Sequence, residues 1–187
     1  MRIEPIDRLP GLVGRIAAWM MKRQLGKVIT PARVVYNRVP RMYQVGYALV
    51  RLQQGGLVLD PTLRHLVTNW VAMQNRCSFC VDIGRASAVL EELDLEKLDA
   101  LPQWRESPLF DERERAALAF ADEANRALSV SDATFERARK HFSEREIVEL
   151  VILGAVENFY NRINLPLGIE EDGLCAIAQH RAARSGR

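Results

Sequence analysis

Two cysteines separated by two residues, Cys77 and Cys80, carry the strongest chemical signal in this sequence. Such a pair can cycle between a dithiol and a disulfide, can supply half of a four-ligand zinc site, or can serve as two small core residues. The third cysteine, Cys175, and the three histidines are scattered and form no second close pair. We therefore expect no metal ion and no bound cofactor, and a redox pair and a structural pair stay open.

The residues around the cysteines predict that the pair lies at the start of a helix. Apolar residues recur at helical spacing in the stretch PTLRHLVTNWVAMQN, which follows Asp60, a good N-cap. That pattern ends near Arg76, and a second helix should begin near Cys77 and run to about Leu93. Free amides and the positive end of a helix dipole lower the pKa of a thiol. The position therefore favours a reactive thiolate.

The rest of the chain also shows helical periodicity, so we predict an all-α fold, a compact helical bundle. Further helices are expected near residues 10–25, 31–38, 41–54, 111–128 and 131–141. Ser143 and Glu146 have the spacing of a capping box ahead of a long apolar run, whose helix should stop before Pro166. An all-α chain argues against a thioredoxin-like dithiol, which follows a strand.

The distribution of charge divides the chain into two parts. A length of 187 residues suits one domain, and residues 1–55 carry ten Lys and Arg against two acids, although the whole chain has a net charge of only +2. We predict a basic helical arm over residues 1–40 that packs on a helical body over residues 41–187. The alternative for the arm is attraction to an anionic membrane surface or an acidic substrate.

Bulk properties also narrow the setting of the protein. The small net charge argues against a nucleic acid as the main partner. No apolar run approaches the roughly 20 residues that span a bilayer, so we expect no stable membrane insertion. The N-terminal residues do not resemble a secretory signal, and three cysteines do not make a full disulfide framework. We therefore predict a cytoplasmic protein.

The stretch LRHLVTNWVAMQNRCSFCVDIGRASA resembles the core of alkylhydroperoxidase D-like proteins, a branch of the carboxymuconolactone decarboxylase superfamily. The similarity covers about residues 45–170. It implies an all-α bundle that forms homo-oligomers and reduces hydroperoxides at the dithiol, which a thiol or dithiol reductant then regenerates. The resemblance assigns the attacking thiolate to Cys80 and the resolving thiol to Cys77, a pairing that avoids overoxidation.

Two positions depart from the family pattern. The family glutamate twelve residues before the first cysteine is His65 here, and the family histidine four residues after the second cysteine is Gly84. We hypothesise that His65 is the general base, because histidine titrates near neutrality, and that Asp82 orients it or relays a proton. The alternative is that His65 is only a surface residue.

Three asparagines, Asn158, Asn161 and Asn164, follow one another at three-residue spacing in the long helix before Pro166. Asparagine is a poor residue for a helix interior, so the repetition needs a reason. The three could line a polar pocket beside the dithiol, or they could satisfy backbone groups at the helix end. The second interpretation is the more usual one and is preferred here.

The sequence thus predicts an antioxidant, dithiol peroxidase-like oxidoreductase that acts on hydroperoxides. One alternative is a non-enzymatic helical oligomer with structural cysteines, and another is a lactone enzyme of the decarboxylase branch. The intact Cys77/Cys80 pair disfavours the decarboxylase reading, since that branch acts without a redox dithiol. A structural pair should resist alkylation until the protein unfolds, whereas a redox pair should react quickly.

Overall fold

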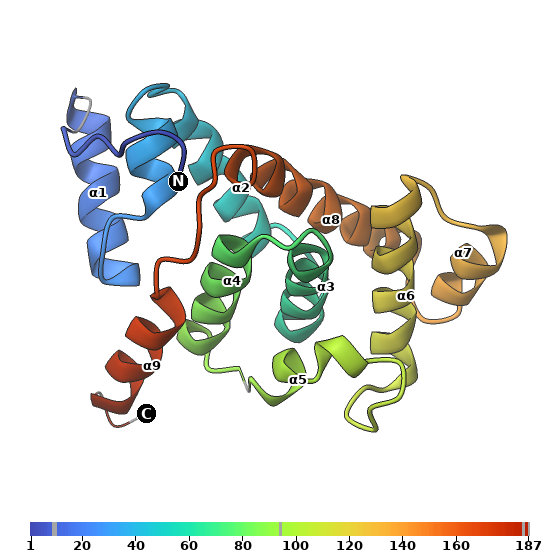
Figure 1. Cartoon of the computed structure of the whole chain (residues 1–187). Helices are drawn as coiled ribbons and strands as arrows, with labels where there is room; N and C mark the ends of the chain where they lie inside the picture. Colours follow the sequence, from blue (N-terminus) through green and yellow to red (C-terminus); the bar gives the residue numbers. More distant parts are fainter. Residues whose placement is uncertain (9–10, 94, 185, 187) are drawn as a thin grey trace.

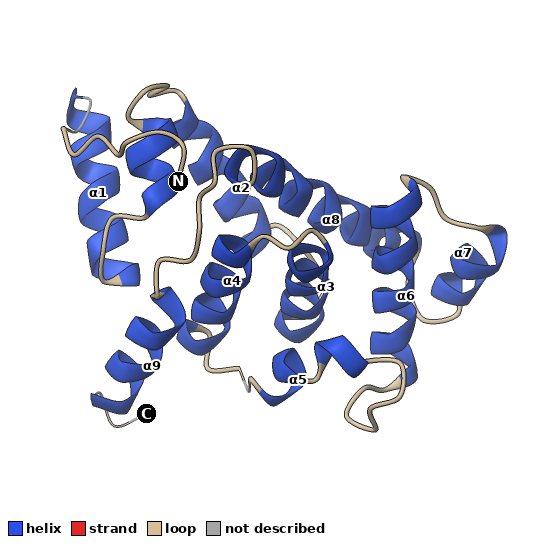
Figure 2. Ribbon diagram, viewed as in Figure 1, coloured by secondary structure: helices blue, strands red, loops and turns tan. Residues whose placement is uncertain are grey.

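The computed structural model describes residues 1–8, 11–93, 95–184 and 186. Over these ranges the chain is helical and has no strand, which confirms the predicted all-α fold (Figures 1 and 2). The α-helices are α1 (Gly11–Leu25), α2 (Met42–Gly55), α3 (Pro61–Gln74), α4 (Ser78–Leu90), α5 (Glu96–Asp99), α6 (Glu112–Ala127), α7 (Asp132–Arg139), α8 (Glu144–Asn164) and α9 (Leu174–Arg184). A π-helical turn, η1 (Ala32–Tyr36), and a 3-10 turn, η2 (Leu101–Gln103), complete the structure.

Helix α3 is the centre of the fold and packs against α4, α6 and α8 (Figure 1). It begins as the sequence predicts, because the Asp60 carboxylate accepts a hydrogen bond of 2.9 Å from the backbone N–H of Leu63. Its predicted apolar stripe is buried, including Leu63, Leu66 and Val67. One hydrophobic cluster joins this stripe to α6, α8 and the segment around η2.

A second hydrophobic cluster contains the two cysteines. It joins the first turn of α4 to η1 and α9, and it includes Tyr36, Phe79 and Leu174. Helices α4 and α9 pack closely against each other, and α8 passes alongside α4. The dithiol therefore lies inside the body of the protein, between the first turn of α4 and the C-terminal half of α8.

The boundaries of α8 follow the local signals in the sequence. Ser143 and Glu146 form the predicted capping box, and the helix ends at Asn164, two residues before Pro166. Helix α9 is not predicted by the sequence pattern. Within residues 31–38, where a helix is expected, the chain forms the short π-helical turn η1 over Ala32–Tyr36. Among the described helices, none is both long enough and apolar enough to cross a membrane.

The N-terminal arm packs on residues of its own chain. The backbone N–H of Ile6 donates to the carbonyl of Arg33 at 3.0 Å, and Arg33 forms an ion pair of 2.7 Å with Asp7. Helix α1 contacts α2 and α9. The division into an arm over 1–40 and a body over 41–187 stays a proposal, to which these contacts lend support.

Candidate active site at the dithiol

The Cys77 and Cys80 side chains are joined in a disulfide, with their Cα atoms 5.2 Å apart. Helix α3 ends in a Schellman motif, in which Arg76 has a left-handed backbone (φ 58°) and the Cys77 N–H donates to the carbonyl of Ala72 at 3.0 Å. Cys77 is then the N-cap of α4, and Cys80 lies in its first turn. The predicted placement of the pair at the start of a helix is confirmed.

Two side-chain amides of α8 reach the sulfur of Cys80. The Nδ2 of Asn161 lies 3.0 Å from Cys80 Sγ, and the Nδ2 of Asn164 lies 3.5 Å from it. The preferred interpretation of the asparagines is therefore wrong for these two residues, because their side chains contact the sulfur of Cys80 and not backbone groups at the helix end. Asn158 instead donates to Asn125 Oδ1 at 2.8 Å and to the carbonyl of Gly154 at 3.0 Å.

The orientation of the Asn161 amide is fixed by its neighbours. Asn75, which ends α3, donates from Nδ2 to Asn161 Oδ1 at 2.7 Å and to Asn158 Oδ1 at 3.0 Å. Asn125 of α6 donates to Asn75 Oδ1 at 3.1 Å. Because the oxygen of Asn161 already accepts from Asn75, its NH2 group is the end that faces the sulfur. The network thus directs a hydrogen-bond donor at Cys80.

A buried carboxyl group that the sequence analysis missed lies one helical turn before Asn161. Glu157 is 9% exposed, and its Oε1 accepts a hydrogen bond of 2.6 Å from Asn161 Nδ2, the same atom that bonds to Cys80. Burial raises the pKa of Glu157 from 4.5 to about 7, although the Asn161 hydrogen bond acts to lower it. A sequence signal did exist, because Glu157 shares the buried face of α8 with Leu150 and Leu153.

His65 has different surroundings. Its Nε2 lies 3.2 Å from the Oε2 of Glu91, an ion pair when the ring is protonated. Within the described part of the chain, no hydrogen bond joins the His65 ring to either cysteine. The hypothesis that His65 is the general base has no direct contact in its support and stays a proposal.

The space beside Gly84 is filled by Asn69 of α3. A Cβ atom at position 84 would lie 2.7 Å from Asn69 Oδ1, and Asn69 is 1% exposed. Asn69 Nδ2 donates to the carbonyl of His65 at 2.9 Å, while its Oδ1 finds no hydrogen-bond partner among the described residues. A histidine at position 84, as in the family pattern, would require Asn69 to move.

Asp82 is buried, and its carboxylate accepts hydrogen bonds from backbone amides near the start of α9. Its carboxylate accepts hydrogen bonds from the N–H groups of Asp172 at 3.0 Å, Leu174 at 2.8 Å and Cys175 at 2.9 Å. These contacts cap the start of α9 and tie it to α4. The predicted role of Asp82 in a proton relay also stays a proposal, and its observed contacts are those of a structural anchor.

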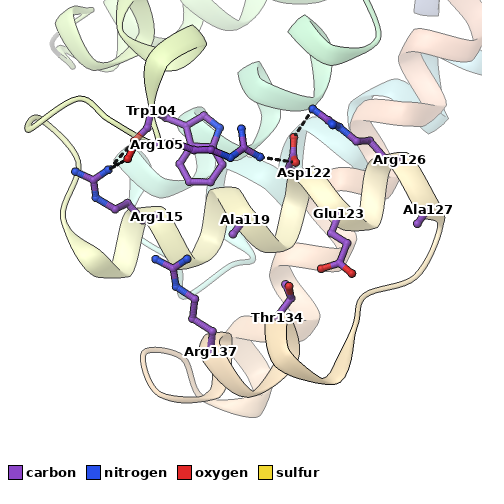
Figure 3. A pocket seen from close by; sticks show the side chains of 10 residues that line it. All are labelled: Trp104, Arg105, Arg115, Ala119, Asp122, Glu123, Arg126, Ala127, Thr134 and Arg137. Atoms are coloured by element: carbon purple, nitrogen blue, oxygen red, sulfur yellow. Dashed lines mark hydrogen bonds and ion pairs between the residues drawn. The ribbon is translucent and has the colours of Figure 1, made fainter.

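A pocket of about 540 Å³ is lined by residues of α6 and α7 and by Trp104 and Arg105 (Figure 3). One of its lining residues is Asp122, whose Oδ2 accepts from Arg105 at 2.7 Å and whose Oδ1 accepts from the Trp70 indole at 3.2 Å. Neither cysteine of the pair lines this pocket. Among the described residues, no group of three His, Cys, Asp or Glu side chains is arranged to hold a metal ion.

The chain is also similar in sequence to known proteins. The model of the carboxymuconolactone decarboxylase family matches residues 42–123. The uncharacterized protein YnjA of Escherichia coli (strain K12) is 34% identical over 184 residues, which cover 97% of this chain and 100% of YnjA. The chain belongs to the carboxymuconolactone decarboxylase family.

Solved structures place this family member in the alkylhydroperoxidase D-like branch. A protein of unknown function from Agrobacterium tumefaciens, described as a candidate antioxidant defence protein AhpD, is 29% identical and superposes with a TM-score of 0.68 over 74% of this chain and 97% of its own. An uncharacterized peroxidase-related protein from Silicibacter sp. TM1040 is 21% identical, with a TM-score of 0.80 over 94% of this chain and 93% of its own. The second likeness shows the fold alone.

Proposed function

We propose that this protein is a dithiol peroxidase that reduces hydroperoxides, with Cys80 as the attacking thiolate and Cys77 as the resolving thiol. The observation that carries the proposal is the pair of amide donors from Asn161 and Asn164 on Cys80 Sγ. Hydrogen bonds to a thiolate favour the charged form, and the start of α4 adds the positive end of a helix dipole. Membership of the alkylhydroperoxidase D-like branch supports the same chemistry.

The two sulfurs differ in a way that supports this division of roles. Within the described residues, no side-chain amide donates to Cys77 Sγ, whereas two donate to Cys80 Sγ. Cys77 is completely buried and Cys80 is 5% exposed, so a peroxide meets Cys80 first. Cys77 lies one helical turn away, where its thiol can condense with an oxidised Cys80.

The reaction balances as a two-electron oxidation of the dithiol. The Cys80 thiolate attacks a peroxide oxygen and the O–O bond breaks, which leaves a sulfenic acid on Cys80 and releases an alkoxide, or hydroxide from hydrogen peroxide. The released anion takes up a proton and becomes an alcohol or water. The Cys77 thiol then displaces water from the sulfenic acid and forms the disulfide. An external thiol or dithiol reductant restores both thiols and becomes oxidised in turn.

The wider setting belongs to the same proposal. We infer a cytoplasmic homo-oligomer that meets a hydroperoxide and a thiol reductant and does not bind nucleic acid. Exposed apolar side chains on α1 (Leu12, Ile16 and Trp19) and on α8 (Val148 and Val151) favour burial against a second copy.

Stopped-flow oxidation of the reduced protein by hydrogen peroxide and by an organic hydroperoxide tests the proposal. We expect Cys80 to react faster than a free thiol, and mass spectrometry should find the Cys77–Cys80 disulfide. Cys80→Ser should abolish the reaction, whereas Cys77→Ser should stop at a trapped sulfenic acid. Cys175→Ser is the matched control and should react normally. A rate no higher than that of a free thiol would instead support the alternative of structural cysteines.

A further inference from the structure

Glu157 is a buried titratable group to which the dithiol mechanism assigns no role. It lies on α8, not at the α3 position where the family pattern has its glutamate. We propose that Glu157 and Cys80 share one proton in the reduced protein, so that Glu157 takes the proton of the Cys80 thiol and returns it to the leaving oxygen of the peroxide. This inference rests on the proposed dithiol chemistry and adds the path of its proton.

One amide group connects the two partners. Asn161 Nδ2 donates to Cys80 Sγ at 3.0 Å and to Glu157 Oε1 at 2.6 Å. Its two hydrogens therefore serve two acceptors, and Asn75 prevents the amide from turning around by occupying its oxygen. Thiolate and carboxylate are the charged forms of those two acceptors, so the arrangement stabilises either anion with the same donor.

Glu157 and Cys80 are too deeply buried to carry a negative charge at the same time. Glu157 is 9% exposed and Cys80 is 5% exposed. Tyr160, on the same helix, interacts with Glu157, and Tyr36 of η1 interacts in turn with Tyr160. Burial raises the pKa of both phenols, so both stay neutral. Within the described residues no Lys, Arg or His forms an ion pair with Glu157. Two close buried acids in such a site ionise as a coupled pair, with one charge between them near neutrality.

The chemistry needs such a proton at two moments. The thiol first loses its proton to the Glu157 carboxylate, which leaves a thiolate and a carboxylic acid. The thiolate then forms the S–O bond while the O–O bond breaks, and the departing alkoxide takes the proton from Glu157. The products are a sulfenic acid, an alcohol and the Glu157 carboxylate, so charge and protons balance. A donor with a pKa near neutrality is suited to both transfers.

A protein with Cys80 as its sole cysteine, made by Cys77→Ser and Cys175→Ser, gives a direct test of proton sharing. The rate of alkylation by iodoacetamide as a function of pH reports the Cys80 thiolate alone. We expect a curve broader than a one-proton titration, and we expect Glu157→Gln to narrow it and move it about one pH unit lower, because a nearby negative charge is removed. Glu149→Gln, the same change at a buried carboxyl of α8 that binds the Val58 and Leu59 amides, should leave the curve in place.

The second measurement tests proton donation. The rate with tert-butyl hydroperoxide, divided by the thiolate fraction, should fall at least about tenfold in Glu157→Gln, since the leaving alkoxide must be protonated. Alkylation should not fall, because iodide leaves without a proton. A one-proton curve in the sole-cysteine protein, or identical curves with and without Glu157, would overturn the inference even if Glu157→Gln proves hard to fold. A shifted alkylation curve without fast peroxide reduction would retain proton sharing and reject the peroxidase function.

Discussion

The two sides of the dithiol differ sharply in what they offer to Cys80. On the α8 side, Asn161 and Asn164 donate to the sulfur, and Glu157 is held by the same Asn161 amide. On the α3 side, His65 pairs with Glu91, and Asn69 fills the space beside Gly84. The family pattern places its acid and base on the α3 and α4 side. The comparison suggests that in this chain the polar groups that serve the sulfur come from α8 instead.

The largest effect is expected at Asp82. It tests whether this residue only holds α9 in place or also takes part in the reaction at the dithiol. Asp82→Ala removes the acceptor of three backbone amides at the start of α9, one of them buried and two partly buried. Hydrogen bonds to a buried charged group are strong, and we expect the free energy of unfolding to fall by roughly 4 kcal/mol. Urea unfolding followed by circular dichroism measures this loss.

The chemistry of the dithiol supplies the control for Asp82. In the fraction of Asp82→Ala that remains folded, the rate of Cys80 oxidation at neutral pH should stay within about twofold of the wild type, since Asp82 faces α9. A full loss of peroxide reactivity with normal stability would show that Asp82 belongs to a proton relay. It would contradict the view that the polar groups serving Cys80 come from α8.

The buried carboxyl on the α8 side should make stability depend on pH. The folded state raises the pKa of Glu157 from 4.5 to about 7, so between these values the folded protein keeps a proton that the unfolded chain releases. The contribution of Glu157 to the free energy of unfolding is therefore fully present below pH 4.5 and is lost as pH rises towards 7. The total loss is about 3 kcal/mol. Glu157→Gln should unfold at higher urea concentrations than the wild type above pH 7, and the difference should vanish below pH 4.5.

Glu149 on the same helix provides a control of opposite sign. Burial acts to raise its pKa, but hydrogen bonds from the Val58 and Leu59 amides and the charge of Arg145 lower it overall. Its contribution to stability is therefore present above the unfolded pKa and is lost as pH falls. Glu149→Gln should destabilise the oxidised protein at neutral pH. Equal pH profiles for the two variants would mean that Glu157 is not buried as a neutral acid.

Local sequence signals predicted the elements that depend on local interactions. Asp60 begins α3, and Ser143 with Glu146 begins α8, because each cap is completed within three residues of the chain. Helix α9 lacks such a signal, since its cap is Asp82, about ninety residues earlier in the chain. The approach of Asn161 to Cys80 likewise depends on how α8 crosses α4. A single sequence shows the residue types for such contacts but not the packing that brings them together.

The smallest effect is expected at His65, and it decides between the two sides of the dithiol. If His65 is the general base, as the sequence hypothesis has it, His65→Ala should slow Cys80 oxidation and remove its pH dependence near neutrality. The observed contacts predict a change of less than about twofold, because the ring pairs with Glu91 and the carbonyl of His65 stays available to Asn69. Stopped-flow oxidation across pH 5 to 9, the range in which histidine and a raised glutamate titrate, measures both quantities. If His65→Ala reacted slowly and without pH dependence while Glu157→Gln reacted normally, the general base would be His65 on α3. The only role left for the α8 amides would then be to stabilise the thiolate.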